Sequence, residues 1–239
     1  MKLWRIISEL FFPSGIKCII CGKELASENR YGVCDKCKIT YNTQYCLKCG
    51  RAIANMATYC DECQNVTQPY DLARAPLIYE NETVSVVHKL KYGGAKYLAE
   101  NMAQFMADVY YEQNINADFI TFVPMYHKKQ KQRGYNQAEL LANELSKLIN
   151  LPVVSTLNRV KQSANLARMG RQERREAIES AFESIVTKND VKDKNVLLID
   201  DVFTTGATSG QCCKVLKKLK CGKITVLTFA TSRQKPELY

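Results

Sequence analysis

Two adjacent acidic residues and a threonine-rich turn form the most informative run of the sequence. Asp200 and Asp201 follow an apolar run that begins at Val196, and the turn at 204–208 comes shortly after them. Such a run predicts a buried parallel strand, and ligands bind at the carboxyl ends of these strands. The turn leads into a predicted helix, whose free backbone amides suit a phosphate group. These residue types therefore predict one ligand that carries both ribose hydroxyls and a phosphate.

Eight of the eleven cysteines form four Cys-x-x-Cys pairs near the start of the chain. The pairs are Cys18 and Cys21, Cys34 and Cys37, Cys46 and Cys49, and Cys60 and Cys63. Two such pairs complete a tetrahedral Zn²⁺ site, so the eight thiolates predict two structural zinc ions with no ligand position left open for catalysis. The spacing favours a sequential pairing, with residues 18–37 on one ion and residues 46–63 on the other, but it also permits a cross-braced pairing.

A disulfide framework in a secreted protein is the alternative interpretation of these cysteines. The opening segment at 3–13 carries charges at Arg5 and Glu9 and is broken by Pro13, so it does not resemble a signal peptide. No apolar stretch of the sequence is long enough to span a membrane. We therefore expect metal-bound thiolates in a reducing, cytoplasmic setting.

The elements that must position these residues alternate between strands and helices. The expected strands cover 74–80, 118–124, 195–200 and 223–230, and the expected helices cover 81–92, 95–111, 136–149 and the stretch after Gly206. Asn136 and Gly222 are the expected N-cap and C-cap of two of these helices. This order predicts an α/β fold with a doubly wound, mainly parallel sheet. We expect it over residues 69–239, after a double zinc ribbon over residues 1–68.

Three segments are rich in lysine and arginine and suit an anionic ligand. They are 123–137, 157–176 and 89–97. The net charge of +10 favours phosphate backbones, and tyrosines in these segments offer stacking surfaces for bases. The tyrosines are Tyr92, Tyr97, Tyr126 and Tyr135. Ordinary solvated loops with half-buried tyrosines explain the same composition, and for 89–97 alone that is the better explanation.

The run at 196–208 resembles the phosphoribosyl pyrophosphate (PRPP) signature of the type I phosphoribosyltransferases. The resemblance implies that Asp200 and Asp201 hold the ribose hydroxyls with Mg²⁺ nearby. It assigns the 5-phosphate to Thr204, Thr205, Gly206, Ala207 and Thr208, and the pyrophosphate to Pro124, Met125 and Tyr126. It also implies a flexible loop from which Arg159 and Lys161 act on the leaving pyrophosphate. Phe203 is bulkier than the branched aliphatic residue usual at its position.

The whole arrangement resembles the ComF family of competence-associated proteins. The resemblance rests on the cysteine pairs, on Val123 and Pro124 with the run at 133–138, and on the signature at 196–208. It implies natural transformation and DNA uptake, single-stranded DNA and competence-machinery proteins as partners, and a retained site for PRPP or another ribose phosphate. The second half also resembles the phosphoribosyltransferase domain of glutamine PRPP amidotransferase. Because the chain starts with Met1 rather than a nucleophilic cysteine, we expect no glutaminase activity.

Two functions therefore remain open. In the first, which we favour, the protein handles single-stranded DNA and keeps a ribose-phosphate site. In the second, it is a Mg²⁺-dependent phosphoribosyltransferase that transfers the phosphoribosyl group of PRPP to an amine or base. Catalysis would then be mostly positioning and electrostatics, with Asp200 and Asp201 on the ribose and with Arg159 and Lys161 on the departing pyrophosphate.

Overall fold

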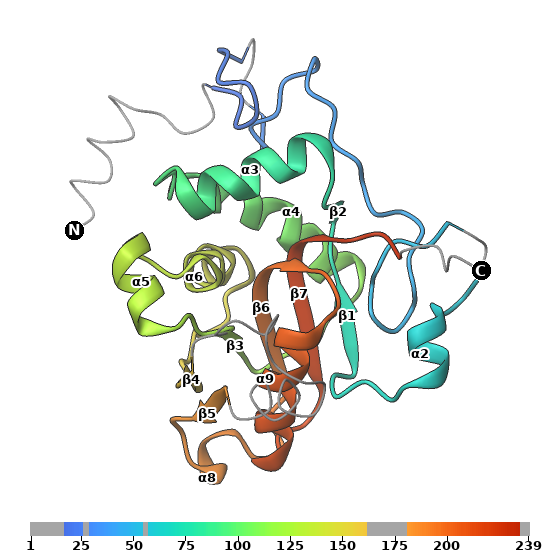
Figure 1. Ribbon diagram of the computed structural model, residues 1–239, viewed down its shortest axis with the longest axis vertical. Coiled ribbons are helices and arrows are strands. Elements are labelled where there is room, and N and C mark those ends of the chain that lie inside the picture. Colours follow the sequence, from blue (N-terminus) through green and yellow to red (C-terminus); the bar gives the residue numbers. More distant parts are fainter. Residues whose placement is uncertain (1–16, 26–28, 55–56, 162–180, 235–239) are drawn as a thin grey trace, which may run out of the picture.

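The computed structural model of the chain describes residues 17–25, 29–54, 57–161 and 181–234 (Figure 1). The opening segment at 3–13 and most of the basic stretch beyond Lys161 lie outside the described residues. Within the described ranges, none of the helices has the length and apolar character that crossing a bilayer requires.

A five-stranded parallel sheet forms the centre of the fold. Its strands are β1 (Leu72–Arg74), β2 (Leu77–Ile78), β3 (Phe119–Phe122), β6 (Val196–Phe203) and β7 (Ile224–Thr231). The order is β1-β7-β6-β3, and β2 pairs with β7 beyond β1. All eight residues of β7 are buried, which agrees with its position inside a sheet that is covered on both faces.

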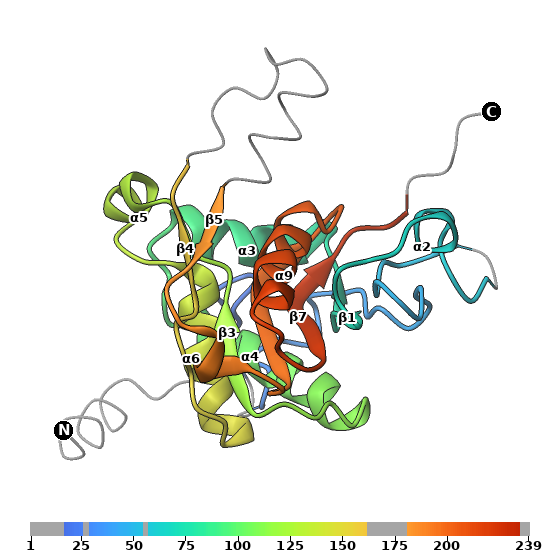
Figure 2. The same cartoon turned by 90° about the horizontal axis from the view of Figure 1, so that it is seen from below.

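Three long helices cover the two faces of this sheet. They are α4 (Leu98–Glu112), α6 (Gln137–Ile149) and α9 (Ala207–Lys218), and a fourth long helix, α3 (Asn81–Tyr92), packs against α4. Seen along the strands, α4 and α6 lie on one side and α9 on the other (Figure 2). Cys212 on α9 is fully buried, and the Asn136 side chain caps α6 by accepting a hydrogen bond from the Ala138 amide. The prediction of a doubly wound, parallel α/β fold is confirmed.

Several local predictions differ from the structure. The expected strand at 74–80 is divided into β1 and β2 at Pro76, which has no amide hydrogen to donate to a ladder. Within the basic segment at 123–137, where the expected helix begins only at residue 136, the structure has the short helix α5 (His127–Arg133). Gly222 is not the C-cap of α9, which ends at Lys218. A Cβ at Gly222 would lie 2.7 Å from Asn195 Oδ1, so close packing accounts for this glycine.

A second difference concerns the basic segment that begins at residue 157. The sequence shows no clear element there, but the structure has the strand β4 (Leu157–Arg159), which pairs antiparallel with β5 (Phe182–Ser184). The short helix α8 (Lys188–Val191) follows β5 and leads toward β6. The two strands bracket residues 162–180, which include the rest of the expected flexible loop and lie outside the described residues.

The cysteine-rich segment packs against the β1 side of the sheet. It is described from residue 17 to Val66 and is called the cysteine module below. It contains the helix α2 (Asp61–Asn65). The Ala73 amide donates to the Lys48 carbonyl at 2.9 Å, and the Gln234 amide donates to the Ala52 carbonyl at 2.8 Å. The module is therefore joined by hydrogen bonds to both β1 and the chain after β7. The boundary at residues 68 and 69 stays a prediction.

Candidate functional site

The turn after β6 forms a small hollow at the carboxyl end of the sheet. Its lining consists of Asp200 and residues 202–209. The Thr205 hydroxyl accepts a hydrogen bond from the Ala207 amide at 3.3 Å, at the first residue of α9. Threonine hydroxyls and the amides of the first helical turn are the donors that a phosphate monoester needs. The predicted phosphate loop thus lies beside one of the two predicted carboxylates.

Gly206 and Phe203 explain the shape of this turn. Gly206 has a φ of +74°, and a Cβ at this position would lie 2.5 Å from the Phe203 ring. Both the left-handed backbone and the close approach therefore require glycine. The Phe203 ring packs edge-on against Tyr70, with 5.8 Å between the ring centroids. The bulky residue noted in the sequence thus fills the space beneath the turn and leaves the threonines at the surface.

The two acidic residues have different neighbours, because successive side chains of a strand point to opposite faces. Asp200 lines the hollow. Asp201 is only 7% exposed, and its Oδ2 lies 2.8 Å from Nζ of Lys91. One carboxylate thus lies beside the phosphate loop, and the other forms an ion pair with a lysine of α3.

The electrostatics of this pair favour a bound cation. Burial raises the pKa of Asp200 to about 7, and the neighbouring Asp201 adds to the shift, while Lys91 and Arg159 oppose it. Burial works against the charged form of Lys91, but Asp201 and Asp200 together raise the pKa of its ammonium group. Proteins usually bind Mg²⁺ through one or two carboxylates together with substrate phosphates. The donor set of Asp200, Asp201 and an incoming phosphate fits that ion.

Lys91 is a site residue that the sequence predictions missed. It belongs to the basic segment at 89–97, which we expected to be a solvated surface. Lys89, two residues earlier in the same helical turn, donates hydrogen bonds to the carbonyls of Ile19 and Ile20 at 3.3 and 2.5 Å. The last turn of α3 therefore contacts both Asp201 and the two residues between Cys18 and Cys21. The sequence signal that could have indicated Lys91 is the pair of lysines, Lys89 and Lys91, at the end of a predicted helix.

Arg159 lies on the Asp200 side of β6, at the end of β4. Its guanidinium lies 5.1 Å from the centroid of the Phe182 ring on β5, and its Nε donates to the Lys161 carbonyl at 3.4 Å. Burial lowers the pKa of Arg159, while electrostatic interactions with Cys212 and Asp200 oppose this change. Lys161 is exposed and is the last described residue before the gap. Catalytic roles for both residues stay predictions.

The expected pyrophosphate turn follows β3, the neighbour of β6. Phe122 pairs with Ile199, and the Val123 amide donates to the Ile199 carbonyl at 2.9 Å. Pro124 is buried, and Met125 and Tyr126 are half-buried. The register therefore places this turn beside the two acidic residues. That it binds pyrophosphate stays a prediction.

The cysteine thiols form two separate clusters. One contains Cys18, Cys21, Cys34 and Cys37, and the other contains Cys46, Cys49, Cys60 and Cys63. Within each cluster the sulfur atoms lie within 4.8 Å of one another, which is the sequential pairing. The Sγ atoms of Cys21 and Cys34 lie 3.7 Å apart, and those of Cys49 and Cys60 lie 3.6 Å apart. Four thiolates about 2.3 Å from a tetrahedral Zn²⁺ lie about 3.8 Å from one another, so both clusters fit zinc.

Backbone amides favour the ionised form of the first cysteine in each cluster. Burial opposes ionisation of Cys18, yet the amides of Cys21, Cys34 and Ile20 lower the pKa of its thiol to about 6. Equivalent amides lower the pKa of Cys46 to about 7 against the effect of burial. The glycines that follow the first and third cysteine pairs have a left-handed backbone, with φ of +72° at Gly22 and +68° at Gly50. This amide geometry suits the binding of a metal by thiolates.

Comparison with known proteins agrees with both parts of this arrangement. The family described as PHF5-like protein matches residues 7–79, and the family described as phosphoribosyl transferase domain matches residues 133–238. Glutamine phosphoribosylpyrophosphate amidotransferase from Bacillus subtilis is one similar solved structure, with a TM-score of 0.39, 17% identity, and coverage of 54% of this chain and 25% of that chain.

Three curated relatives have names that refer to competence or to DNA. Competence protein F of Haemophilus influenzae is 29% identical over 221 residues, which is 90% of this chain and 96% of that protein. DNA utilization protein YhgH of Salmonella typhimurium is 25% identical, with the same coverage of both chains. Competence protein ComFC of Bacillus subtilis is 32% identical over 46% of this chain and 43% of its own length. The chain is therefore a homologue of competence protein F, YhgH and ComFC, with a PHF5-like cysteine module and a phosphoribosyltransferase domain.

Proposed function

We propose that the protein binds PRPP or another ribose phosphate at the carboxyl end of β6 and handles single-stranded DNA in the cytoplasm during natural competence. The single observation that carries the ribose-phosphate part is the hollow in which Asp200 faces the threonine turn at 204–208. The names of the relatives support the DNA part, because they refer to competence and to DNA utilization.

The ligand fits the site in one orientation. The 5-phosphate contacts the threonine turn and the first amides of α9, and the ribose hydroxyls reach Asp200 and Asp201. Asp200 and Asp201 would hold Mg²⁺ together with the ligand phosphates, and the ion would supply positive charge there. Lys91 holds Asp201 by an ion pair of 2.8 Å. This ion pair keeps the carboxylate in position before the ligand binds.

The cysteine module contributes structure rather than chemistry in this proposal. Two zinc ions close the two clusters, and a four-thiolate site leaves no position for a substrate. The binding free energy of such ions, on the order of 10 kcal/mol or more, stabilises a small module that has little apolar core of its own. The module and the basic surface of the sheet domain together face the DNA, and competence-machinery proteins are the further partners.

A second candidate function is favoured by Arg159. Its guanidinium interacts electrostatically with Asp200, which supports a role for Arg159 at the proposed site. In a phosphoribosyltransferase reaction, Asp200 and Asp201 hold the ribose while positive charge develops at its anomeric carbon. Arg159 and Lys161 stabilise the departing pyrophosphate. The acceptor would be an amine or a base.

Calorimetric titration with PRPP and Mg²⁺ tests the site directly. We expect saturable binding to the zinc-loaded wild-type protein and its loss in Asp200→Asn/Asp201→Asn. The matched control is Asp193→Asn, which removes an exposed carboxylate that lies 3.8 Å from Nζ of Lys192. The backbone of Asp193 has a positive φ, which asparagine also adopts. Equal binding by the double variant and the wild type would exclude these carboxylates as the ribose site.

A further inference from the structure

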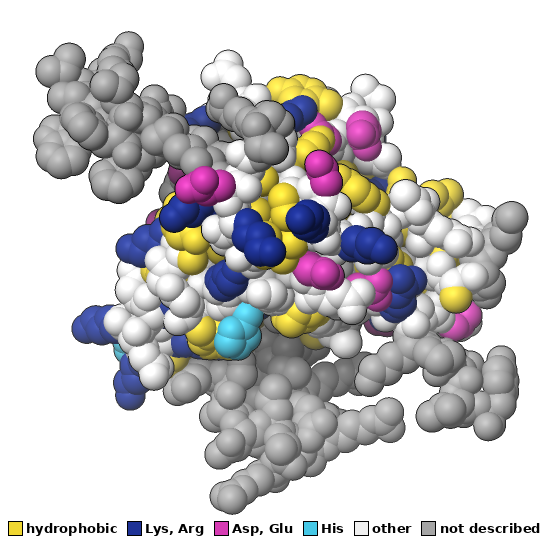
Figure 3. Space-filling view, turned by 90° about the horizontal axis from the view of Figure 1, so that it is seen from above, with side chains coloured by type: hydrophobic (Ala, Val, Ile, Leu, Met, Phe, Trp, Pro, Cys, Tyr) yellow, Lys and Arg dark blue, Asp and Glu magenta, His cyan; other side chains and the backbone are white. Residues whose placement is uncertain are grey.

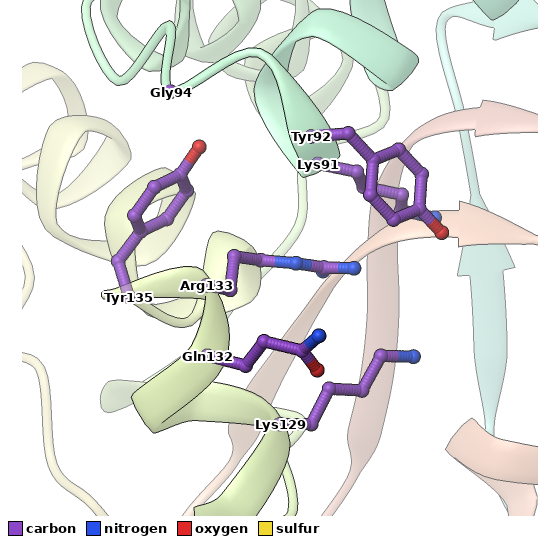
Figure 4. A pocket seen from close by; sticks show the side chains of 7 residues that line it. All are labelled: Lys91, Tyr92, Gly94, Lys129, Gln132, Arg133 and Tyr135. Carbon is purple, nitrogen blue, oxygen red and sulfur yellow. The ribbon is translucent and has the colours of Figure 1, made fainter.

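A second pocket, of about 380 Å³, lies between the end of α3 and the helix α5. Lys91, Tyr92, Gly94, Lys129, Gln132, Arg133 and Tyr135 line it. Figure 4 shows Lys129, Gln132 and Arg133 extending from α5 in a common direction, with Lys91 and Tyr92 extending from the end of α3. Residues three and four apart share one face of a helix, which explains why the α5 side chains converge. Because Lys91 also pairs with Asp201, the pocket adjoins the proposed ribose-phosphate site.

The pocket combines positive charge with an exposed aromatic ring. The Arg133 guanidinium lies 4.9 Å from the centroid of the Tyr92 ring. Tyr92 is 65% exposed, and Tyr97, a few residues further along, is 69% exposed. Tyr135 differs from both, because it is buried and its hydroxyl donates to the Leu90 carbonyl. Of the four tyrosines predicted to stack on bases, Tyr92 and Tyr97 are exposed, Tyr126 is half-buried, and the buried Tyr135 forms part of the pocket wall. The Tyr92 ring also contacts His88, with 4.6 Å between the ring centroids.

Two cations of this pocket, Lys129 and Arg133, lack acidic partners among the described side chains, whereas Lys91 pairs with Asp201. No ion pair within those residues involves Lys129 or Arg133. Figure 3 shows lysine and arginine side chains spread over the face on the α3 side of the molecule. An anion that binds Lys129 and Arg133 in the pocket therefore displaces no salt bridge of the described residues.

We propose that the pocket binds one nucleotide, with its phosphate at Lys129 and Arg133 and its base against the exposed Tyr92 ring. The inference rests on the proposed function and deepens it by naming where nucleic acid meets the protein. A sugar phosphate such as PRPP has no aromatic ring that could stack on Tyr92. Every nucleic-acid base has one, so bases stack on tyrosine rings in any nucleotide sequence. The volume lies within the usual range for a small-ligand site, which runs from about 300 to 1,000 Å³. The nucleotide is either free or one unit of a single strand that passes the mouth of the ribose-phosphate site.

The test compares three variants of the full-length, zinc-loaded protein. They are Lys129→Gln/Arg133→Gln, Tyr92→Ala and the control Lys128→Gln/Lys131→Gln, which removes the same charge from the same helix outside the pocket lining. Fluorescence anisotropy measures the affinity for a labelled oligothymidylate at several salt concentrations. Parallel titrations use dTMP alone and PRPP with Mg²⁺. Circular dichroism and zinc content verify that each variant is folded.

We expect Lys129→Gln/Arg133→Gln to weaken oligonucleotide binding at least tenfold and to reduce the salt slope by about 0.7, the contribution of the one phosphate that both cations contact. Tyr92→Ala should weaken binding roughly tenfold with little change of the salt slope, because stacking is not ionic. The control should lose far less affinity, and PRPP affinity should stay within about twofold of wild type in all three variants.

The other outcomes separate this proposal from the function on which it rests. Wild-type DNA affinity in both pocket variants would place the DNA elsewhere and overturn the proposal while DNA handling stands. Equal losses of PRPP and DNA affinity would assign the pocket to the diphosphate site and also overturn it. Binding of dTMP that depends on the pocket, without any gain from an oligonucleotide, would identify the free nucleotide as the ligand. If the wild type binds neither dTMP nor the oligonucleotide, both the proposal and DNA handling fail.

Discussion

Asp200 and Asp201 are neighbours on one strand, yet the fold gives them different tasks. Asp201 already has a partner in Lys91, which offsets its charge in the folded protein. Asp200 lines the hollow and interacts electrostatically with both members of that ion pair. Burial and the charge of Asp201 raise the pKa of Asp200 to about 7. The carboxylate that faces the phosphate loop is therefore the one that costs stability when it ionises. A raised pKa in a concave site is typical of groups that act on a ligand.

This raised pKa predicts a pH-dependent cost in stability. The folded protein holds a proton on Asp200 between its ordinary pKa of 3.8 and its raised value of about 7, so stability falls as pH rises through this window. Replacing Asp200 with asparagine removes the cost. Relative to wild type, Asp200→Asn should gain about 1 kcal/mol between roughly pH 6 and pH 8.5, measured by urea unfolding. Asp193→Asn should show no such trend, and a gain that is independent of pH would contradict the assignment.

The sequence was sufficient to predict that the acidic pair lies on a buried strand followed by a turn and a helix, because strand, acids and turn are contiguous. It could not predict the partner of Asp201, because Lys91 is 110 residues away in the sequence and its role depends on how α3 packs. Arg133 is a similar case, since only the fold brings its guanidinium over the Tyr92 ring. Contacts between distant elements depend on tertiary packing, which local residue patterns do not encode.

At the scale of elements, the last turn of α3 connects two sites. Lys89 and Lys91 are two residues apart, so on a helix they point to different sides. Lys89 reaches the carbonyls between Cys18 and Cys21, and Lys91 reaches Asp201. A displacement of this turn would therefore affect both the first cysteine cluster and the ribose-phosphate site.

Lys89→Met tests this connection from the cysteine side. The variant leaves the carbonyls of Ile19 and Ile20 without their ammonium donor, and a hydrogen bond to a charged group contributes roughly 1.5–3 kcal/mol. We expect the first cluster to release its metal to a chromogenic chelator roughly tenfold faster, with the second cluster unchanged. Lys131→Met on α5 provides the control for loss of an exposed lysine. Equal release rates in Lys89→Met and wild type would remove the stabilising role of Lys89.

The elements themselves were predictable to different degrees. Apolar runs and amphipathic spacing predicted the bounds of β6, β7, α3 and α6 to within a few residues, because burial in the core imposes those patterns. The helix α5 has the sequence HKKQKQR, which contains no apolar residue and therefore no periodicity to detect. The strands β4 and β5 have three residues each and pair across more than twenty residues, so neither their length nor their spacing marks them in the sequence.

At the scale of the whole molecule, the two cysteine clusters differ in their surroundings. Only Cys18 is buried in the first cluster, whereas three of the four cysteines are buried in the second. The second cluster also adjoins the sheet, since a Cβ at Gly50 would collide with the Ala73 carbonyl of β1. The first cluster is thus the more accessible one, and the second is part of the main core.

We therefore predict that metal is lost in two steps. A chelator should remove the first ion while the sheet domain stays folded, and loss of the second should coincide with a large drop in thermal stability. Native mass spectrometry followed in parallel with circular dichroism would resolve the steps. Among single substitutions, Cys49→Ser should lower Tm much more than Cys21→Ser. Simultaneous loss of both ions, or equal effects of the two substitutions, would contradict this order.

The position of β7 has a consequence for biosynthesis. This strand lies between β1 and β6, yet among the strands of the described residues it is the last to leave the ribosome. Until residues 224–231 emerge, β1 and β6 cannot be joined, and each presents an open edge of unpaired amides and carbonyls. A nascent or prematurely terminated chain that ends before Ile224 would therefore expose two apolar strand edges, which makes it a substrate for chaperones and proteases.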